Sequence, residues 1–169
     1  MGQLSAYRFP ESSGWEKVWS WTNEEGFKQS QPKFIELPTA IRDYDILLVL
    51  PKGFMWTYAS GQYGSSQNLT MYFTTEQNTN HTSTNKVITI SNVNQIDTKI
   101  NQLLNFGFSF IVLKDNITVF SVNDSTGELV SRAIHRVNIN DLNYLALKAF
   151  ASAEIVGGTI DFYGMNLPK

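Results

Sequence analysis

Residues 34–51 (FIELPTAIRDYDILLVLP) constrain the fold more than any other stretch of this chain. A short apolar piece ends at Pro38, a charged corner containing Tyr44 and Asp45 follows, and residues 46–50 are apolar without interruption. That run is too short to span a membrane, which takes about 20 residues, and too apolar for an exposed edge strand. We therefore predict a buried strand at residues 45–50, preceded by one helical turn at residues 39–44.

Strand-like patterns continue along most of the chain. Short apolar runs and period-2 alternation predict strands at residues 15–21, 34–37, 45–50, 54–59, 69–74, 86–93, 106–114, 117–122, 129–139 and 159–163. Glycine, proline and asparagine mark the connections between them, and Asp115 and Asn116 predict a tight hairpin turn. Both faces of residues 129–139 are mixed, which is typical of an edge strand or an interface.

Three tryptophans mark the first expected strand. Trp15, Trp19 and Trp21 share a parity with Lys17, so the period-2 pattern places all four side chains on one face. The main interpretation is a strand that faces the core or a subunit interface. The alternative is a platform for sugar rings, because flat aromatic faces pack well against them.

Two segments are candidates for helices. Residues 94–105 show the 3.6-residue apolar period of a short helix packed over a sheet, with the stripe formed by Ile96, Ile100, Leu103 and Leu104. Residues 141–152 fit the period of a strand and also that of a helix. We favour the strand, because Gly157 and Gly158 would then turn the chain into residues 159–163 as a hairpin.

Many short strands, regular turn signals and the absence of alternating strands and helices predict the fold class. We expect a mainly β protein, an antiparallel β-sandwich or jelly-roll-like domain with one short helix near residues 94–105. Residues 15–169 are expected to form a single domain, and residues 1–14 an N-terminal arm.

Composition excludes several classes of function. The net charge is −2, whereas a nucleic-acid-binding protein needs a basic surface, so we expect no nucleic acid as a partner. The chain has no cysteine, which rules out disulfides and thiolate chemistry. No run of about 18 apolar residues occurs, so no membrane insertion is expected. Charged residues make up only 17% of the chain, which suits a protein that packs against other proteins or meets neutral polar ligands.

The tryptophan-rich opening strand, the stretch FIELPTAIRDYDILLVL at residues 34–50 and the closing IDFYGM at residues 160–165 resemble a known group of proteins. They are similar to the β-sandwich modules of tailed-bacteriophage structural proteins, in tail fibres, baseplates and head or tail appendages. In that group a Tyr-Asp or Phe-Asp corner feeds an apolar strand, and the module ends on a strand with an aromatic residue before glycine. The resemblance covers residues 15–60 and 144–165, and the middle third matches only in style.

The resemblance implies a non-enzymatic virion protein, a homotrimeric fibre, spike or decoration protein attached to capsid or tail proteins, with a role in binding a host-surface glycan or protein. It carries over no catalytic residues. Such a protein would be found in the virion, after synthesis and assembly in the host cytoplasm. The N-terminal sequence agrees, because it lacks the charged and apolar regions of a secretory signal peptide.

Residues that could carry chemistry are sparse. The two histidines, His81 and His135, have no metal-ligand spacing to each other, so we expect no metal site. No Gly-x-Ser-x-Gly motif marks a nucleophilic serine. The patterns therefore predict a protein that is not an enzyme and that needs no cofactor.

A recognition surface, if the chain has one, is expected around the polar loop at residues 60–68 and the loop at residues 76–85. Aromatic rings and amides beside the first loop have the chemistry that recognises sugars or protein surfaces; the candidate ligand-binding residues are Trp56, Tyr58, Tyr63, Gln67 and Tyr72. The alternative function that they indicate is a carbohydrate-binding β-sandwich module. Ordinary packing of these aromatic residues in the sandwich is the other interpretation.

Overall fold

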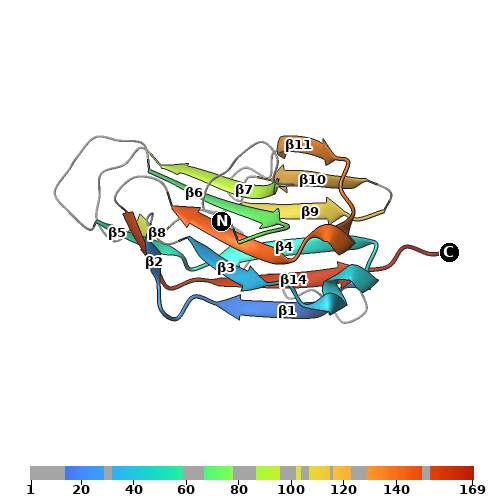
Figure 1. Ribbon diagram of the computed structural model, residues 1–169, viewed down its shortest axis with the longest axis horizontal. Helices are drawn as coiled ribbons and strands as arrows, with labels where there is room; N and C mark the ends of the chain where they lie inside the picture. Colours follow the sequence, from blue (N-terminus) through green and yellow to red (C-terminus); the bar gives the residue numbers. More distant parts are fainter. Residues whose placement is uncertain are drawn as a thin grey trace.

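The computed structural model describes residues 14–28, 32–58, 67–77, 87–95, 102–103, 107–114, 116–122, 129–149 and 153–169. These residues form three antiparallel sheets and two short 3-10 helices (Figure 1). The six-stranded sheet has the order β1-β14-β4-β9-β10-β11, with strands at Glu16–Thr22, Thr159–Met165, Ile46–Lys52, Phe108–Val112, Ile117–Val122 and Leu129–His135.

Two smaller sheets complete the described fold. The sheet β3-β12-β6-β7 consists of Lys33–Glu36, Tyr144–Ala149, Gln67–Thr74 and Val87–Gln95. The sheet β2-β13-β5-β8 consists of Phe27–Lys28, Ala153–Val156, Met55–Tyr58 and Gln102–Leu103. The 3-10 helices are η3, Thr39–Asp43, and η4, Ile139–Asp141.

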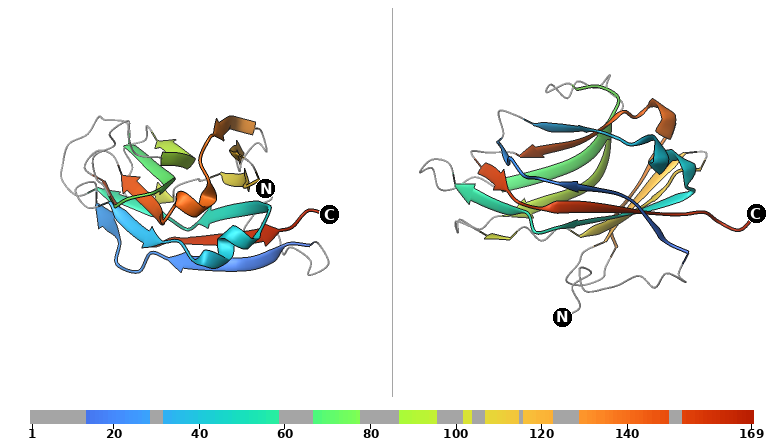
Figure 2. Two further views of the ribbon diagram at one scale, coloured as in Figure 1. Left: turned by 45° about the vertical axis from the view of Figure 1, so that its right-hand side comes forward. Right: turned by 90° about the horizontal axis from the view of Figure 1, so that it is seen from below.

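The six-stranded sheet and the β3-β12-β6-β7 sheet lie as two layers (Figure 2), with the third sheet at the end drawn on the left in Figure 1. Apolar side chains from both layers form one core, with Leu47 and Val49 from β4 and Met71 from β6 among them. The rings of Phe73 and Phe162, one from each layer, stack with centroids 6.3 Å apart. The predicted fold class, an antiparallel β-sandwich, is therefore confirmed.

The corner before β4 binds the end of the last strand. Helix η3 confirms the predicted helical turn, and β4 confirms the buried strand. The ring of Tyr44 lies so close to Gly164 that a Cβ on that glycine would be 2.3 Å from Cγ of Tyr44. The backbone N–H of Asp45 donates to the carbonyl oxygen of Met165 (3.2 Å), and its carboxylate accepts from the N–H of Leu167 (2.8 Å). The two motifs that carry the family resemblance thus contact each other.

A bulge in β7 connects the two layers through hydrogen bonds. The register of β6 and β7 shifts between Met71 and Tyr72, which leaves Ile90 outside the ladder. The carbonyl oxygen of Ile90 accepts hydrogen bonds from the hydroxyls of Ser109 (2.7 Å) and Ser121 (2.8 Å), which are cross-strand partners in β9 and β10. The two serines therefore satisfy a backbone acceptor that the bulge would otherwise leave without a partner.

The expected helix at residues 94–105 is wrong where the structure describes that range. Asn94 and Gln95 continue β7 opposite Asn68 and Gln67 of β6, and Gln102 and Leu103 form β8 beside β5. Pairing with neighbouring strands prevails over the helical period of the isolated sequence. Residues 96–101 and 104–105 lie outside the described residues.

The strand interpretation of residues 141–152 is confirmed by β12, but the hairpin that supported it is wrong. Strand β13 pairs with β2 and β5, whereas β14 pairs with β1 and β4. Gly157 (φ +61°) and Gly158 (φ +105°) lead the chain from one sheet to another, in a backbone region that disfavours other residues. A Cβ on Gly158 would also lie 2.4 Å from the ring of Phe54.

Other expectations are met in part. Strands β9 and β10 pair as a hairpin around position 115, which itself lies outside the described residues. Strand β11 is an edge strand, as its mixed faces suggested, but it ends at His135 because the chain then approaches η4. Of the expected arm, residues 1–14, only Gly14 is described. Within the described part of the chain, no helix has the length and apolar character needed to cross a membrane.

Candidate functional site

The candidate ligand-binding residues fall on two strands and the connection between them. Trp56 and Tyr58 belong to β5, where they pair with Ile155 and Ala153 of β13. Gln67 is the first residue of β6. The backbone therefore places Tyr58 and Gln67 at opposite ends of one connection, and Tyr63, within it, lies outside the described residues.

Tyr72, the fifth candidate, lies inside the protein. Its side chain is 1% exposed, and burial raises the pKa of its hydroxyl to about 12. A ring at this depth has no face free to stack on a sugar at the surface. We therefore leave Tyr72 out of any recognition surface.

Trp15, Trp19 and Trp21 do not share a face, which corrects the expected pattern, because Trp15 packs against Phe110 of β9 whereas the other two face the core. The register between β1 and β14 shifts between Lys17 and Trp19, so Val18 breaks the alternation. Trp19 packs toward the core, with its ring 5.0 Å from that of Phe162, and Trp21 also packs against the core. Lys17 lies on the other side of the sheet. The described residues thus offer no platform of three indoles.

The face of the six-stranded sheet that points away from the core is largely apolar along β4, β9 and β10, and we call this surface the outer face. Along β4, β9 and β10, core side chains alternate with side chains that point the other way. By this alternation the outer face carries Ile46, Leu48, Leu50, Phe108, Phe110, Val112, Thr118, Phe120 and Val122. All but Thr118 are apolar. A sheet with one face in water normally carries polar side chains there.

Aromatic rings occupy the middle of the outer face. Phe110 of β9 lies opposite Leu48 of β4 and opposite Phe120 of β10. The rings of Phe108 and Phe110 meet edge to face, with centroids 5.4 Å apart. Trp15, just before β1, packs against Phe110 with a centroid distance of 6.1 Å. Leu48, between these groups, is only 1% exposed.

The outer face continues to the edge of the sheet at β11. Leu129 pairs with Val122, Arg132 with Phe120 and Ile134 with Thr118. Since cross-strand partners point to the same side of a sheet, Leu129 and Ile134 belong to the outer face, with the charged position Arg132 between them in the register. Each of these two apolar side chains is 58% exposed.

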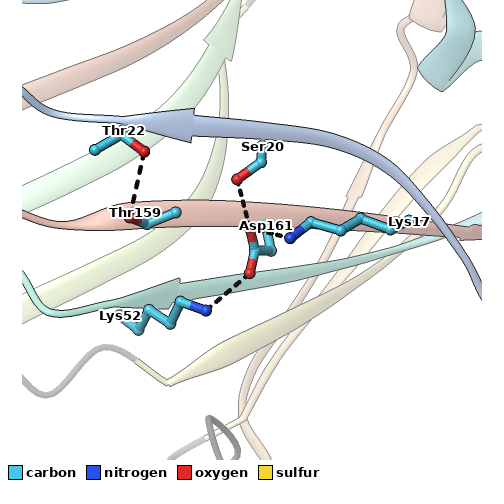
Figure 3. A network of polar contacts seen from close by, with 6 residues as sticks. All are labelled: Lys17, Ser20, Thr22, Lys52, Thr159 and Asp161. Carbon is cyan, nitrogen blue, oxygen red and sulfur yellow. Dashed lines mark hydrogen bonds and ion pairs between the residues drawn. The ribbon is translucent and has the colours of Figure 1, made fainter. Parts of the chain in front are cut away.

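A polar cluster borders the outer face at β1 and β14 (Figure 3). The carboxylate of Asp161, 4% exposed, accepts a hydrogen bond from the hydroxyl of Ser20 (2.6 Å) and pairs with the ammonium groups of Lys17 and Lys52, each at 3.0 Å. The ammonium group of Lys17 also lies 5.9 Å from the ring centroid of Tyr163. These contacts connect three neighbouring strands, β1, β14 and β4.

The environment of Asp161 lowers the pKa of its carboxyl group below the usual value of 3.8. Burial alone raises that pKa, because it disfavours the charged form. The hydrogen bonds from Ser20, Lys17 and Lys52, with the positive charge of Lys52, together outweigh burial and favour the carboxylate. The polar groups of the cluster bond to one another, so the role of the cluster is to hold neighbouring strands of the sheet together.

The described residues show little that could carry catalysis. No group of three or more His, Asp or Glu side chains among them could hold a metal ion. Burial lowers the pKa of His135, and His81 lies outside the described residues. The outer face is therefore the surface whose character most needs an explanation.

Sequence reasoning did not find this surface, although two signals pointed to it. Residues 46–50 are apolar at every position, which is typical of a strand buried on both faces. In residues 108–112 the alternate positions Phe108, Phe110 and Val112 form an apolar face, and Ile111 on the opposite face is apolar as well. A β-strand that is apolar on both faces must be covered on both.

Comparison with known proteins adds little. No protein-family model matches the chain, and no curated protein matches it significantly. One solved structure that it resembles is the lectin UEA-II complexed with galactose, at 9% sequence identity and a TM-score of 0.33, over 90% of this chain and 100% of the lectin chain. A likeness this weak carries no argument about function.

Proposed function

We propose that this protein is a structural subunit that assembles with other protein subunits through the outer face, and that it serves in the virion of a tailed bacteriophage. The observation that supports assembly is the apolar outer face, whereas the virion role rests on the sequence resemblance alone. A two-layer sandwich requires apolar side chains only on its two inner faces. Where a second apolar face stays exposed, as at Leu129 and Ile134, it is typical of a surface that another protein covers.

The chemistry of the outer face is that of a subunit interface. Interface cores are rich in aromatic residues and poor in charge, and the rings of Phe108, Phe110 and Phe120 lie in the middle of this face. Charged groups gather at its border, where Lys17 and Lys52 pair with Asp161. An apolar centre with a polar border is the usual layout of a protein–protein contact.

The arrangement of the strands also supports an outer face that is already rigid before a partner binds. Strands β4, β9 and β10 of the outer face have neighbours on both sides, and the Asp161 cluster connects β1, β14 and β4. A surface on a rigid sheet loses little conformational entropy when a partner binds. We propose that the partner is another copy of the chain, in the homotrimer that the family resemblance implies.

Light scattering of the purified protein tests the assembly. We expect a molar mass that is a multiple of that of the 169-residue chain at micromolar concentration. Replacing Phe120 with Asp should shift the protein to monomers, because the interface would then have to bury a charge. A wild-type protein that is a clean monomer under these conditions would contradict self-assembly.

The genes beside the coding sequence test the virion role independently. We expect capsid and tail genes on either side. Neighbouring genes of an unrelated process, with no virion gene among them, would contradict the virion role without touching the assembly proposal.

The carbohydrate-binding alternative has less support from the geometry. The indole of Trp15 packs against Phe110, whereas those of Trp19 and Trp21 face the core. Tyr72 is buried. The candidate ligand-binding residues therefore lose Tyr72, and the separate alternative of a three-indole platform is not supported. Loss of glycan binding in a folded Trp56→Ala protein would restore this alternative.

A further inference from the structure

The polar cluster at the border of the outer face carries more positive than negative charge. Lys17 and Lys52 share the carboxylate of Asp161, and each ammonium group lies 3.0 Å from one of its oxygens. Among the described positions of β1, β14, β4, β9 and β10 that point away from the core, Asp161 is the only acidic residue and the two lysines are the only basic ones. This side of the five strands therefore has a surplus of one positive charge.

The cluster is continuous with the apolar part of the outer face. Asp161 is the cross-strand partner of Leu50, and Tyr163 is that of Leu48, and cross-strand partners point to the same side of a sheet. Lys52 follows Leu50 by two positions on β4, so it points to that side as well. A partner that covers Leu48 and Leu50 therefore also lies beside the two ammonium groups.

The lysines differ from Asp161 in their access to water. The side chain of Asp161 is 5% exposed, whereas those of Lys17 and Lys52 are each 48% exposed. Water therefore solvates the surplus charge in the free subunit. A partner that covers the border removes this water, which is unfavourable unless another charge compensates the ammonium groups. A carboxylate on the partner is the side-chain group that does so, through charge-assisted hydrogen bonds.

The surplus charge also disfavours a contact of the outer face with itself. A two-fold symmetric contact uses the same surface on both subunits, and when the strands of two stacked sheets are nearly aligned, its axis runs across the strands or along them. In the first case the lysines of the two copies lie over one another. In the second they lie over β11, where the register places the charged position Arg132 opposite Phe120. Both arrangements bring like charges together, which opposes association.

Other surfaces of the described chain carry the opposite charge. Glu36 of β3 and Asp43 of η3 are exposed, and so is Glu76, which follows β6. None of these three residues belongs to the six-stranded sheet. A second copy of the chain can therefore supply a carboxylate from a surface other than its own outer face.

We propose that the outer face binds a different surface of a second copy, and that this surface presents a carboxylate to Lys17 and Lys52. The proposal rests on the assembly role proposed above and adds the chemistry of the opposing surface. A contact between two different surfaces repeats from copy to copy, and it closes into a ring where the rotation between the copies allows. A homotrimer is one such ring.

Neutral variants of the lysines test the carboxylate contact in the full chain. Lys17→Gln and Lys52→Gln each leave Asp161 with the other lysine and with Ser20, and circular dichroism should show that both variants fold. We expect each to associate with a dissociation constant about tenfold higher than that of the wild type in sedimentation equilibrium, because an interfacial ion pair is lost. Lys52→Arg keeps the charge and should associate as the wild type does.

Lys33→Gln is the matched control, since it also removes a lysine that forms one ion pair, here with Glu25 and in the other layer. It should leave the dissociation constant unchanged. Without an opposing carboxylate, removal of a surplus charge makes the border easier to cover. Folded Lys17→Gln and Lys52→Gln proteins that associate as tightly as the wild type, or more tightly, would therefore overturn the carboxylate contact.

The salt dependence of the wild type measures the same contact without any substitution. Its dissociation constant should rise as sodium chloride increases from about 0.05 M to about 0.5 M, because salt screens the pairing of opposite charges. A dissociation constant that stays level or falls over this range would speak against the carboxylate contact.

A tagged Phe120→Asp protein tests whether the opposing surface is a different one. This variant has a defective outer face but keeps its other surfaces, so it should retain untagged wild-type chains although it does not associate with itself. In a contact of the outer face with itself, every pair that includes the variant would carry the defect. A tagged variant that retains no wild-type chains would overturn the contact between different surfaces.

These outcomes keep the two proposals apart. A wild type that stays monomeric at all concentrations overturns the assembly role and this contact together. If the wild type associates and Phe120→Asp alone does not, while the neutral lysine variants associate as tightly as the wild type, the assembly role holds and only the carboxylate contact is overturned.

Discussion

Some single residues in this protein hold neighbouring strands together at points where the alternation of side chains places a charged group in a buried position. Asp161 is the clearest case, because a carboxylate that is 4% exposed is stable only when it is paired. Ser20 and the two lysines supply those partners from β1 and β4, on either side of β14. The carboxylate of Asp161 therefore links three neighbouring strands.

The lowered pKa of Asp161 predicts how stability depends on pH. Relative to its usual value of 3.8, the folded protein favours the ionised form more than the unfolded chain does. The stabilisation is complete above about pH 4 and is lost as the pH falls through the lowered pKa of the folded state. Urea unfolding of the wild type should therefore show a decrease in the free energy of unfolding below about pH 4.

An Asp161→Asn variant should be less stable than the wild type at pH 7 by about 1–3 kcal/mol and should lose part of this pH dependence. Glu24→Gln, which removes an exposed carboxylate, is the matched control and should retain the wild-type profile. An Asp161→Asn protein with the full acid dependence of the wild type would contradict the assignment.

The contact between Tyr44 and Gly164 gives a second prediction. Gly164→Ala places a methyl group where the Tyr44 ring lies, so we expect a loss of about 1–3 kcal/mol in the free energy of unfolding. Tyr44→Ala removes the obstacle, and the effect of Gly164→Ala should be much smaller in that background. Additive effects in this double-mutant cycle, measured by urea unfolding, would show that the two residues do not interact.

At the scale of strands and bulges, the hydrogen bonds to the carbonyl oxygen of Ile90 link the two layers. Ser109→Ala or Ser121→Ala alone leaves one donor in place, so each should cost about 0.5–1.5 kcal/mol. The double variant leaves the acceptor unsatisfied and should cost more than the sum of the two single changes. Thermal unfolding of the four proteins measures this difference, and strict additivity would contradict the shared acceptor.

The sequence predicted the elements best where the pattern was local. The strand at 45–50 and the turn at 39–44 follow from a continuous apolar run and a proline, and both are present. The helix at 94–105 was wrong because partners distant in the sequence, such as Asn68 for Asn94, decide the strand. The hairpin after Val156 was wrong because two glycines also suit a crossing between sheets.

The candidate site was harder to predict from the sequence than the fold. Alternation showed that Phe108 and Phe110 share a face, but not which face points to the core. That depends on the layer that packs above the sheet, and the buried Ser109, an unusual core residue, resolves it only once Ile90 is seen as its partner. The Lys17–Trp19 register shift likewise cannot be read from one strand alone.

For the whole molecule, the central property is that strands β4, β9 and β10 of the six-stranded sheet are largely apolar on both faces. The core explains one face. We propose that assembly explains the other. Assembly requires that the exposed end of the outer face, at Leu129 and Ile134, contact protein in the assembled state.

The most direct test is the molar mass of three proteins at the same micromolar concentration: the wild type, Ile134→Asp and Thr89→Asp. Both substitutions add a charge at an exposed strand position, and circular dichroism should show that both fold. We expect Ile134→Asp to be monomeric while the wild type and Thr89→Asp are oligomeric, because a buried charge opposes association. An Ile134→Asp protein that assembles as the wild type does would contradict the outer face as the assembly surface.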